Sequence, residues 1–198
     1  MSSQAKASRA TVRRISSAAL RLLETGGPGR VTMRRVAGAV GITPMAIYHH
    51  FPNREALLKA VTDQEFEKLL GFIEERWAAS TPETRIVEVM LGYLDYAFAQ
   101  PRVFDYVFSQ PRTNARRFPG DFRARRSPTL NRVADTVEEA MNTGRLKKDD
   151  VWEVALALWA YAHGYMSLYR AGRFELSEEE FQSLFRRSMQ RFLDGLNA

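Results

Sequence analysis

A glycine between two short apolar-patterned segments constrains the fold of this chain more than any other feature. In the stretch TMRRVAGAVGITPMAIYHHF, residues 32–51, a segment suited to a short helix over 33–40 ends at Gly41. Thr43 and Pro44 then supply the cap and the first residue of a second short helix. Glycine adopts a positive φ without strain, as a sharp reversal of the chain requires. The spacing therefore predicts a helix-turn-helix.

Helix-start signals recur along the rest of the chain, and no convincing run of alternating apolar and polar residues predicts a strand. Thr81-Pro82 and Ser127-Pro128 repeat the cap-and-proline signal, and residues 177–180 form a capping box. We expect an all-α protein. Its predicted helices cover about residues 8–25, 33–40, 44–50, 54–79, 82–99, 102–110, 128–143, 150–171 and 178–195.

Positive charge is concentrated in the first third of the chain. The net charge of the 198 residues is +6, but residues 1–59 alone carry +8 and the remainder carries −2. A basic head joined to a near-neutral body is typical of a protein that binds a polyanion through the head. We expect a three-helix DNA-binding domain over residues 1–53 and a second domain over 54–198, with the helix 54–79 as the connector.

The second short helix carries the candidate DNA-reading side chains. If Val36, Ala37 and Ile47 face inward, the opposite side of this helix is free to meet base edges while neighbouring groups hold phosphates. The alternative is that these are ordinary surface residues of a helical hairpin. The candidate DNA-binding residues are Thr32, Arg34, Arg35, Thr43, Pro44, Met45, Tyr48, His49 and Arg54.

Residue types that serve catalysis or metal binding are scarce. The chain has no Cys and three His, and it lacks a Walker loop, a G-x-S-x-G elbow and an H-E-x-x-H motif. His49 and His50 are adjacent, and neighbours on a helix do not face each other. We expect no enzymatic activity, no cofactor and no metal site.

The location of the protein is predicted from what the sequence lacks. The absence of Cys gives no sign of an oxidising compartment, and the N-terminus has no signal-peptide core. The longest charge-free stretch, Val154–Tyr169, is shorter than the roughly 18–20 apolar residues that span a bilayer. We expect a cytoplasmic protein without a membrane partner.

The segment TVRRISSAALRLLETGGPGRVTMRRVAGAVGITPMAIYHHFPNREALLKAV strongly resembles the N-terminal DNA-binding domain of the TetR family of bacterial transcription regulators. The likeness covers about residues 9–61. The resemblance implies an all-helical homodimer that binds a near-palindromic operator in double-stranded DNA, usually as a repressor. The residues that carry the likeness include Thr32, Val36-Ala37, Gly41, Tyr48, His50-Phe51 and Glu55–Leu58.

One position departs from the family pattern. Family members often carry Lys-Gly or another polar pair where this chain has Pro44-Met45. Pro44 offers no N–H and Met45 no strong hydrogen bond. We therefore expect base reading to rest on apolar contact with thymine methyl groups and on Arg34 or Arg35.

The second domain is rich in aromatic residues, and its tyrosines suggest a pocket because buried hydroxyl groups need partners. The stretch LWAYAHGYMSLYRAGRF, residues 158–174, is similar to a Trp…His-Gly pattern in the C-terminal domains of one TetR subgroup. His163 is either a pocket group that senses a small-molecule effector or a core histidine. The candidate effector-binding residues are Tyr93, Tyr96, Phe104, Trp159 and His163.

The last two predicted helices have apolar faces that allow two interpretations. Paired with their symmetry mates they would form the four-helix dimer interface that the family implies. Alternatively, they only close the core of the single chain. The candidate interface residues are Leu158, Tyr165, Phe181, Phe185, Met189 and Phe192.

Residues 111–126, PRTNARRFPGDFRARR, are rich in Arg and broken by Pro and Gly, which predicts a mobile surface loop with DNA contact as the alternative.

For the whole chain, the leading hypothesis is a repressor that a small-molecule effector releases from its operator. The alternatives are an activator that needs a co-effector, and a non-specific DNA-binding protein whose salt dependence is the same for all sequences.

Overall fold

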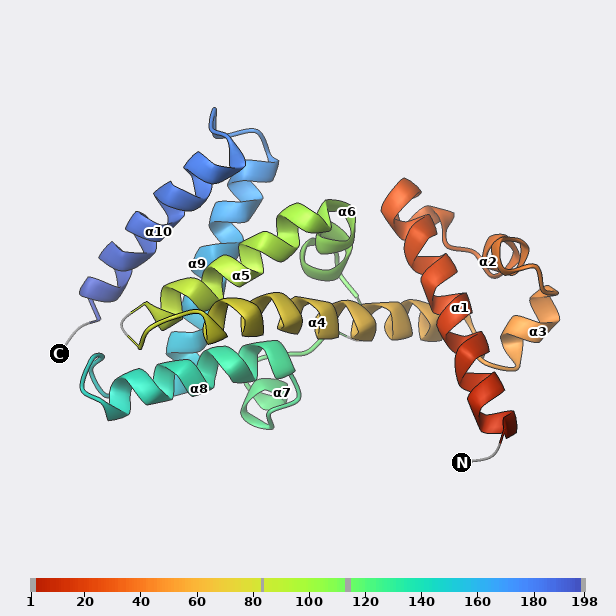
Figure 1. Ribbon diagram of the computed structural model, residues 1–198, viewed down its shortest axis with the longest axis horizontal. Helices are drawn as coiled ribbons and strands as arrows, with labels where there is room; N and C mark the ends of the chain where they lie inside the picture. Colours follow the sequence, from red (N-terminus) through yellow and green to blue (C-terminus); the bar gives the residue numbers. More distant parts are fainter. Residues whose placement is uncertain (1–2, 83, 113–114, 197–198) are drawn as a thin grey trace. The chain divides into compact units, whose positions relative to one another are not determined.

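The computed structural model describes residues 3–82, 84–112 and 115–196 and confirms the all-α prediction for them, with no strand in these ranges. Figure 1 shows the helices in chain order. They are α1 (Ser3–Gly26), η1 (Pro28–Arg30), α2 (Met33–Val40), α3 (Pro44–Tyr48), α4 (Arg54–Ala78), α5 (Arg85–Ala99), α6 (Pro101–Phe104), η2 (Asp105–Ser109), α7 (Gly120–Arg123), α8 (Pro128–Asn142), α9 (Val151–Arg170) and α10 (Glu178–Asp194).

Several helices differ from their predicted bounds. The predicted helix 102–110 is divided into α6 and the π-helical turn η2. The predicted loop 111–126 contains the short helix α7, whose Phe122 is buried and packs edge-on against Trp159. A mobile loop is therefore wrong for this part, because one aromatic side chain anchors a segment that shows no apolar period.

Packing divides the chain into two compact units. The first comprises the described residues of 1–65 and 100–114, and the second those of 66–99 and 115–198. Hence α6 and η2 pack with the N-terminal head. Within this unit, the guanidinium of Arg102 donates to the backbone oxygens of Glu24 and Thr25, at 3.0 and 2.5 Å, and so supplies partners for the last carbonyls of α1. The predicted functional boundary at residues 53 and 54 stays a prediction.

The second unit is built around α5, which contacts α8, α9 and α10. Most of its side chains are buried, because the helix is apolar on nearly every side. Gly92 lets α5 approach α4 closely. A Cβ at this position would lie 2.9 Å from the Cα of Ile73 and from the carbonyl oxygen of Phe72.

Gly92→Ala is expected to lower the free energy of unfolding by about 1–3 kcal/mol, because the added methyl group would clash with backbone atoms of α4, which can move only if the helix itself shifts. Gly71→Ala on the exposed side of α4 is the matched control. A Cβ there has no neighbour within 4 Å, so the helix should gain about 0.5–1 kcal/mol. Chemical denaturation measures both changes, and an equal effect of the two would contradict the close approach.

Candidate nucleic-acid interface and C-terminal sites

The predicted helix-turn-helix is present as α2, a turn and α3. Gly41 ends α2 with φ 74° and ψ 36°, the left-handed conformation that the turn requires. Each helix has a threonine cap. The hydroxyl oxygen of Thr32 accepts from the N–H of Arg35 at 3.3 Å, and that of Thr43 accepts from the N–H of Ala46 at 3.2 Å. Local sequence signals thus set both helix starts and the reversal between them.

Side chains behind the motif hold α2 and α3 against α1. Val36, Ala37 and Ile47 are buried, as predicted, and Phe51 closes the core beside them. An arginine adds a link that the sequence analysis missed. The Nη2 of Arg14 in α1 donates to the carbonyl oxygen of Val40 at 3.0 Å and so caps the end of α2. No local pattern signals this bond, because its partners are 26 residues apart.

The outer face of the motif carries eight of the nine predicted DNA-binding residues, all of them exposed. Met45 and Tyr48 of α3 are 68% and 48% exposed and are the largest apolar side chains on this face. In a head that carries +8, such a face offers apolar contact for base edges and donors for phosphates. The eight residues are Thr32, Arg34, Arg35, Thr43, Pro44, Met45, Tyr48 and His49.

Arg54, the ninth predicted residue, has partners within the chain. Its Nε donates to the carbonyl oxygen of Val31 at 2.6 Å, and its Nη2 donates to that of Pro28 at 2.5 Å. These bonds hold the turn that leads into α2. A DNA contact by Arg54 stays a prediction, whereas its role in positioning this turn follows from the contacts.

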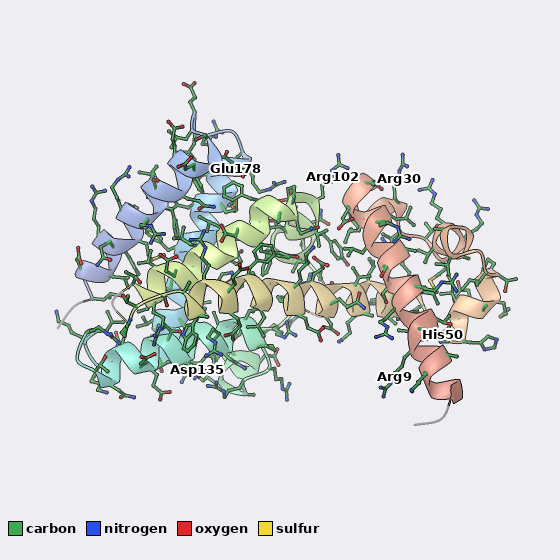
Figure 2. The ribbon with its side chains drawn as sticks, viewed as in Figure 1. Arg9, Arg30, His50, Arg102, Asp135 and Glu178 are labelled. Carbon is green, nitrogen blue, oxygen red and sulfur yellow. The ribbon has the colours of Figure 1, made fainter. Side chains whose placement is uncertain are left out.

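Other basic side chains lie at both ends of α1. Figure 2 shows Arg9 near the start of this helix and Arg30 near its end. Arg9 is exposed, as is Arg30. The positive charge of the head is thus not confined to α2 and α3, and a long stretch of phosphate backbone could meet it.

Two family models match most of the chain. One, described as "Bacterial regulatory proteins, tetR family", matches residues 15–61 and so covers the helix-turn-helix. The other, described as "Tetracyclin repressor-like, C-terminal domain", matches residues 86–192, more than half of the chain. The chain belongs to the TetR family. It is accordingly a transcription regulator with a DNA-binding helix-turn-helix, and not an enzyme.

Solved structures share the fold over nearly the whole chain. A protein of unknown function from Rhodococcus sp. RHA1 has a TM-score of 0.79 and 21% identity, and the match covers 94% of this chain and 95% of that one. A tetR-family regulatory protein from Rhodococcus RHA1 has a TM-score of 0.64 and 20% identity, covering 94% and 97%. These likenesses concern the fold alone. The narrower Trp…His-Gly subgroup of TetR proteins is not tested by them.

A curated relative matches a shorter stretch. The nucleoid occlusion factor SlmA of Salmonella paratyphi B is 28% identical over 83 residues, which is 40% of this chain and 42% of that protein. This TetR chain therefore spans less than half the length of the relative. None of the described helices combines the length and the apolar composition that a membrane span requires.

The predicted effector-binding residues fall into three places. The hydroxyl of Tyr93 lies 3.0 Å from the Nδ1 of His163 and is hydrogen-bonded to Trp159, so these three residues form one cluster. Burial raises the pKa of Tyr93. Tyr96 is buried edge-on against Phe72, while Phe104 packs on Phe108 in the first unit. An effector contact for any of them stays a prediction.

The predicted dimer residues divide into two groups. Leu158, Phe181, Phe185 and Met189 are 0% exposed in the single chain, so they close its core and leave no surface for a second copy. Tyr165 and Phe192 are half-buried. A helical stripe of apolar residues has the same pattern in a protein core and in an interface. The sequence pattern therefore could not separate the buried group from the half-buried group.

The arginines of the predicted loop mostly have partners within the second unit. Arg126 pairs with Asp121 at 3.0 Å, and Arg116 lies over the ring of Phe66 at 4.4 Å from its centroid. Arg123 and Arg125 pair with Asp150 and Asp135. These contacts favour a structural role for the loop over a free basic arm that binds DNA.

Proposed function

We propose that this TetR-family chain is a sequence-specific repressor that binds a palindromic operator as a homodimer and is released by a small-molecule effector. The observation that carries this proposal is the exposed face of α3, where Met45 and Tyr48 project from a basic head. Met45 and Tyr48 are three residues apart on one helix and so lie together, and apolar side chains exposed side by side mark interaction sites. Contact with the major groove accounts for them.

The two capping threonines can serve the DNA backbone as well as the protein. In each cap the hydroxyl oxygen accepts a backbone N–H, which leaves the hydroxyl hydrogen of Thr32 and Thr43 free to donate to a phosphate. Both hydroxyls lie at helix N-termini, where anions are favoured. We assign these two residues to positioning on DNA, and Pro44 and Met45 to contact with thymine methyl groups.

Tyr48→Phe is expected to weaken operator binding by about 1 kcal/mol, or about fivefold, through the loss of one hydrogen bond to phosphate. The ring stays, so the fold of α3 and dimerisation should not change. Fluorescence anisotropy with a labelled operator measures the affinity. Unchanged affinity would remove the Tyr48 hydroxyl from the DNA contacts.

Selection of bound sites from random duplex DNA at near-physiological salt tests the proposed function. An enriched inverted repeat whose half-sites lie about one helical turn apart, roughly 34–36 Å, is the expected result for a dimer. Binding without sequence preference, with the same salt dependence for every duplex, would instead support a non-specific DNA-binding protein. An effector that releases the operator must itself bind more weakly to the DNA complex.

We further propose that the homodimer forms through the accessible face of α9 and α10. Along this face the half-buried rings of Phe192, Tyr161, Tyr165 and Phe174 follow one another with centroid separations of 5.0, 5.1 and 6.2 Å. The hydroxyl of Ser188 bonds both tyrosine hydroxyls, so covering this face with a second copy would leave neither hydroxyl without a partner. The next turn of α9 adds Leu168, which is 50% exposed.

Leu168→Asp is expected to weaken dimerisation at least about tenfold, because a charge would be buried in an apolar contact. Phe118→Asp is the control, since Phe118 is also exposed, at 36%, but lies outside α9 and α10. Sedimentation velocity across a dilution series measures the dimer fraction. A dimer unaffected by Leu168→Asp would place the interface elsewhere.

A further inference from the structure

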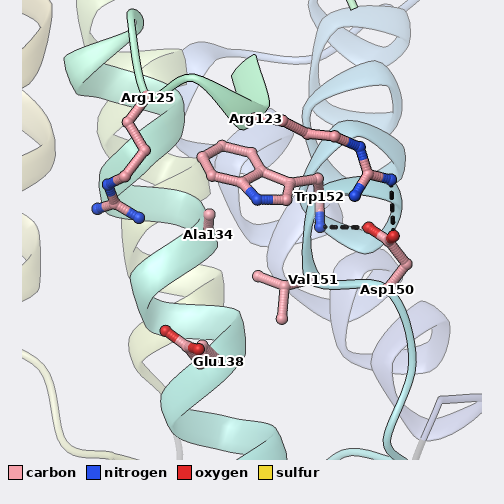
Figure 3. A pocket seen from close by; sticks show the side chains of 7 residues that line it. All are labelled: Arg123, Arg125, Ala134, Glu138, Asp150, Val151 and Trp152. Atoms are coloured by element: carbon pink, nitrogen blue, oxygen red, sulfur yellow. Dashed lines mark hydrogen bonds and ion pairs between the residues drawn. The ribbon is translucent and has the colours of Figure 1, made fainter. Parts of the chain in front are cut away.

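A pocket in the second unit lies apart from every residue predicted to bind an effector. It has a volume of about 300 Å³ and opens between α7, α8 and the start of α9. Figure 3 shows the indole ring of Trp152 between Arg123 and Arg125, with Ala134 and Glu138 of α8 on one side and Val151 and Asp150 on the other. The volume is at the small end of the roughly 300–1,000 Å³ typical of ligand pockets, so a small metabolite fits.

The two arginines of the pocket are held in place before any ligand arrives. The Nη2 of Arg123 lies 2.7 Å from a carboxylate oxygen of Asp150, whose other oxygen accepts the backbone N–H of Trp152. Arg125 pairs with Asp135 at 2.6 Å and lies 5.8 Å from the ring centroid of Trp152. Each guanidinium has five N–H donors, so donors remain on both after these contacts.

The backbone of Arg125 strengthens this arrangement. Its φ is +56°, a conformation that residues with a side chain seldom adopt. The Nδ2 of Asn131 donates to the carbonyl oxygen of Arg125 at 2.8 Å and stabilises it there. The guanidinium is thus presented beside Trp152 from a fixed point on the chain.

Two polar groups of the pocket have no partner among the described residues. Glu138 is exposed and has no ion pair, and the indole N–H of Trp152 has no acceptor. The pocket therefore offers one unpaired negative charge together with spare N–H donors. The half-buried side chain of Val151 adds a small apolar surface.

This combination selects the class of ligand. A simple anion could accept from the spare donors of Arg123 and Arg125 but would face the unpaired charge of Glu138. A simple cation would be attracted by Glu138 but repelled by Arg123 and Arg125. A molecule that carries both charges satisfies both sets of groups at once.

We propose that this pocket binds a small zwitterion of the amino-acid class. The ammonium group pairs with Glu138, and the carboxylate accepts from the indole N–H of Trp152 and from one of the two guanidinium groups beside it. A short aliphatic side chain meets Val151. The site is distinct from the DNA-binding face, and binding does not depend on whether the ligand affects the operator.

The probes are L-leucine, isopentylamine and 4-methylpentanoate, which share a skeleton and differ in charge. The chain has three Trp, so the indole N–H signal of Trp152 is assigned in an NMR spectrum of the ¹⁵N-labelled full chain as the one that Trp152→Phe lacks. We expect L-leucine to shift this signal saturably at millimolar concentration. The amine and the acid should each bind about fivefold more weakly, as expected for the loss of one partly exposed ion pair.

Glu138→Gln is expected to weaken L-leucine binding about fivefold. Glu179→Gln, a change of the same kind on the exposed first turn of α10, should leave it unchanged. The proposal is overturned if no standard L-amino acid shifts the Trp152 signal, if 4-methylpentanoate binds as tightly as L-leucine, or if Glu138→Gln has no effect. Because no DNA is present, each of these outcomes is separate from the success or failure of the repressor proposal.

Discussion

Phe185→Ala is expected to lower the free energy of unfolding by about 3–5 kcal/mol. The ring has no exposed surface and packs against Tyr165 and Tyr161, with centroid separations of 5.5 and 6.3 Å. Its removal leaves a cavity between α9 and α10 that these larger side chains cannot fill without moving. Urea denaturation followed by circular dichroism measures the loss.

The matched control for Phe185→Ala is Leu168→Ala, on the same pair of helices but at a side chain that is 50% exposed. Its effect on the unfolding of the single chain should stay within about 0.5 kcal/mol. Both variants need to be measured at several protein concentrations, because dimerisation contributes to apparent stability. If Phe185→Ala split the dimer and left the fold intact, Phe185 would belong to the interface and not to the core.

Met45→Glu is expected to reduce operator affinity by about 100-fold or more. The side chain is 68% exposed on α3, so the fold should tolerate glutamate, whereas a carboxylate brought against DNA meets the negative phosphates and loses the apolar contact. Fluorescence anisotropy with the selected operator gives the affinity. Circular dichroism checks that the helix content is unchanged.

Gly71→Glu is the control for Met45→Glu, because it adds the same charge on the exposed side of α4 in the second unit, where a side chain meets no neighbour within 4 Å. It should change operator affinity by much less. If the two variants weakened binding equally, the effect would come from the total charge of the protein. The assignment of α3 as the reading helix would then fail.

Features set by neighbours in sequence were predictable here, and features set by distant partners were not. Gly41, Thr43 and Pro44 determine a turn and a helix start within a few residues, so the helix-turn-helix could be predicted. Arg14 and Arg54 each find backbone carbonyls more than 20 residues away, and no local signal points to such partners. From the sequence, their positive charge indicated only that they contribute to a DNA-binding surface.

The pocket beside Trp152 could not have been predicted for a similar reason. Its walls come from α7, α8 and the start of α9, and α7 lies in a stretch without apolar periodicity. What fixes that stretch is one buried ring, Phe122, together with ion pairs to residues farther along the chain. Pattern analysis weighs many residues together, and so it misses a segment that one buried ring and a few ion pairs hold in place.

The membership of α6 and η2 in the first unit limits how the DNA-binding head can be isolated. Cutting the chain after Glu65 would remove Arg102 and leave the carbonyls of Glu24 and Thr25 without their guanidinium partner. The other fragment, residues 66–198, would keep Val103 and Phe104. Both side chains are buried in the intact protein, so the cut would expose them. We therefore expect a head in which residues 100–114 are joined back through a linker to be more stable than residues 1–65 alone, because the first unit is discontinuous in sequence.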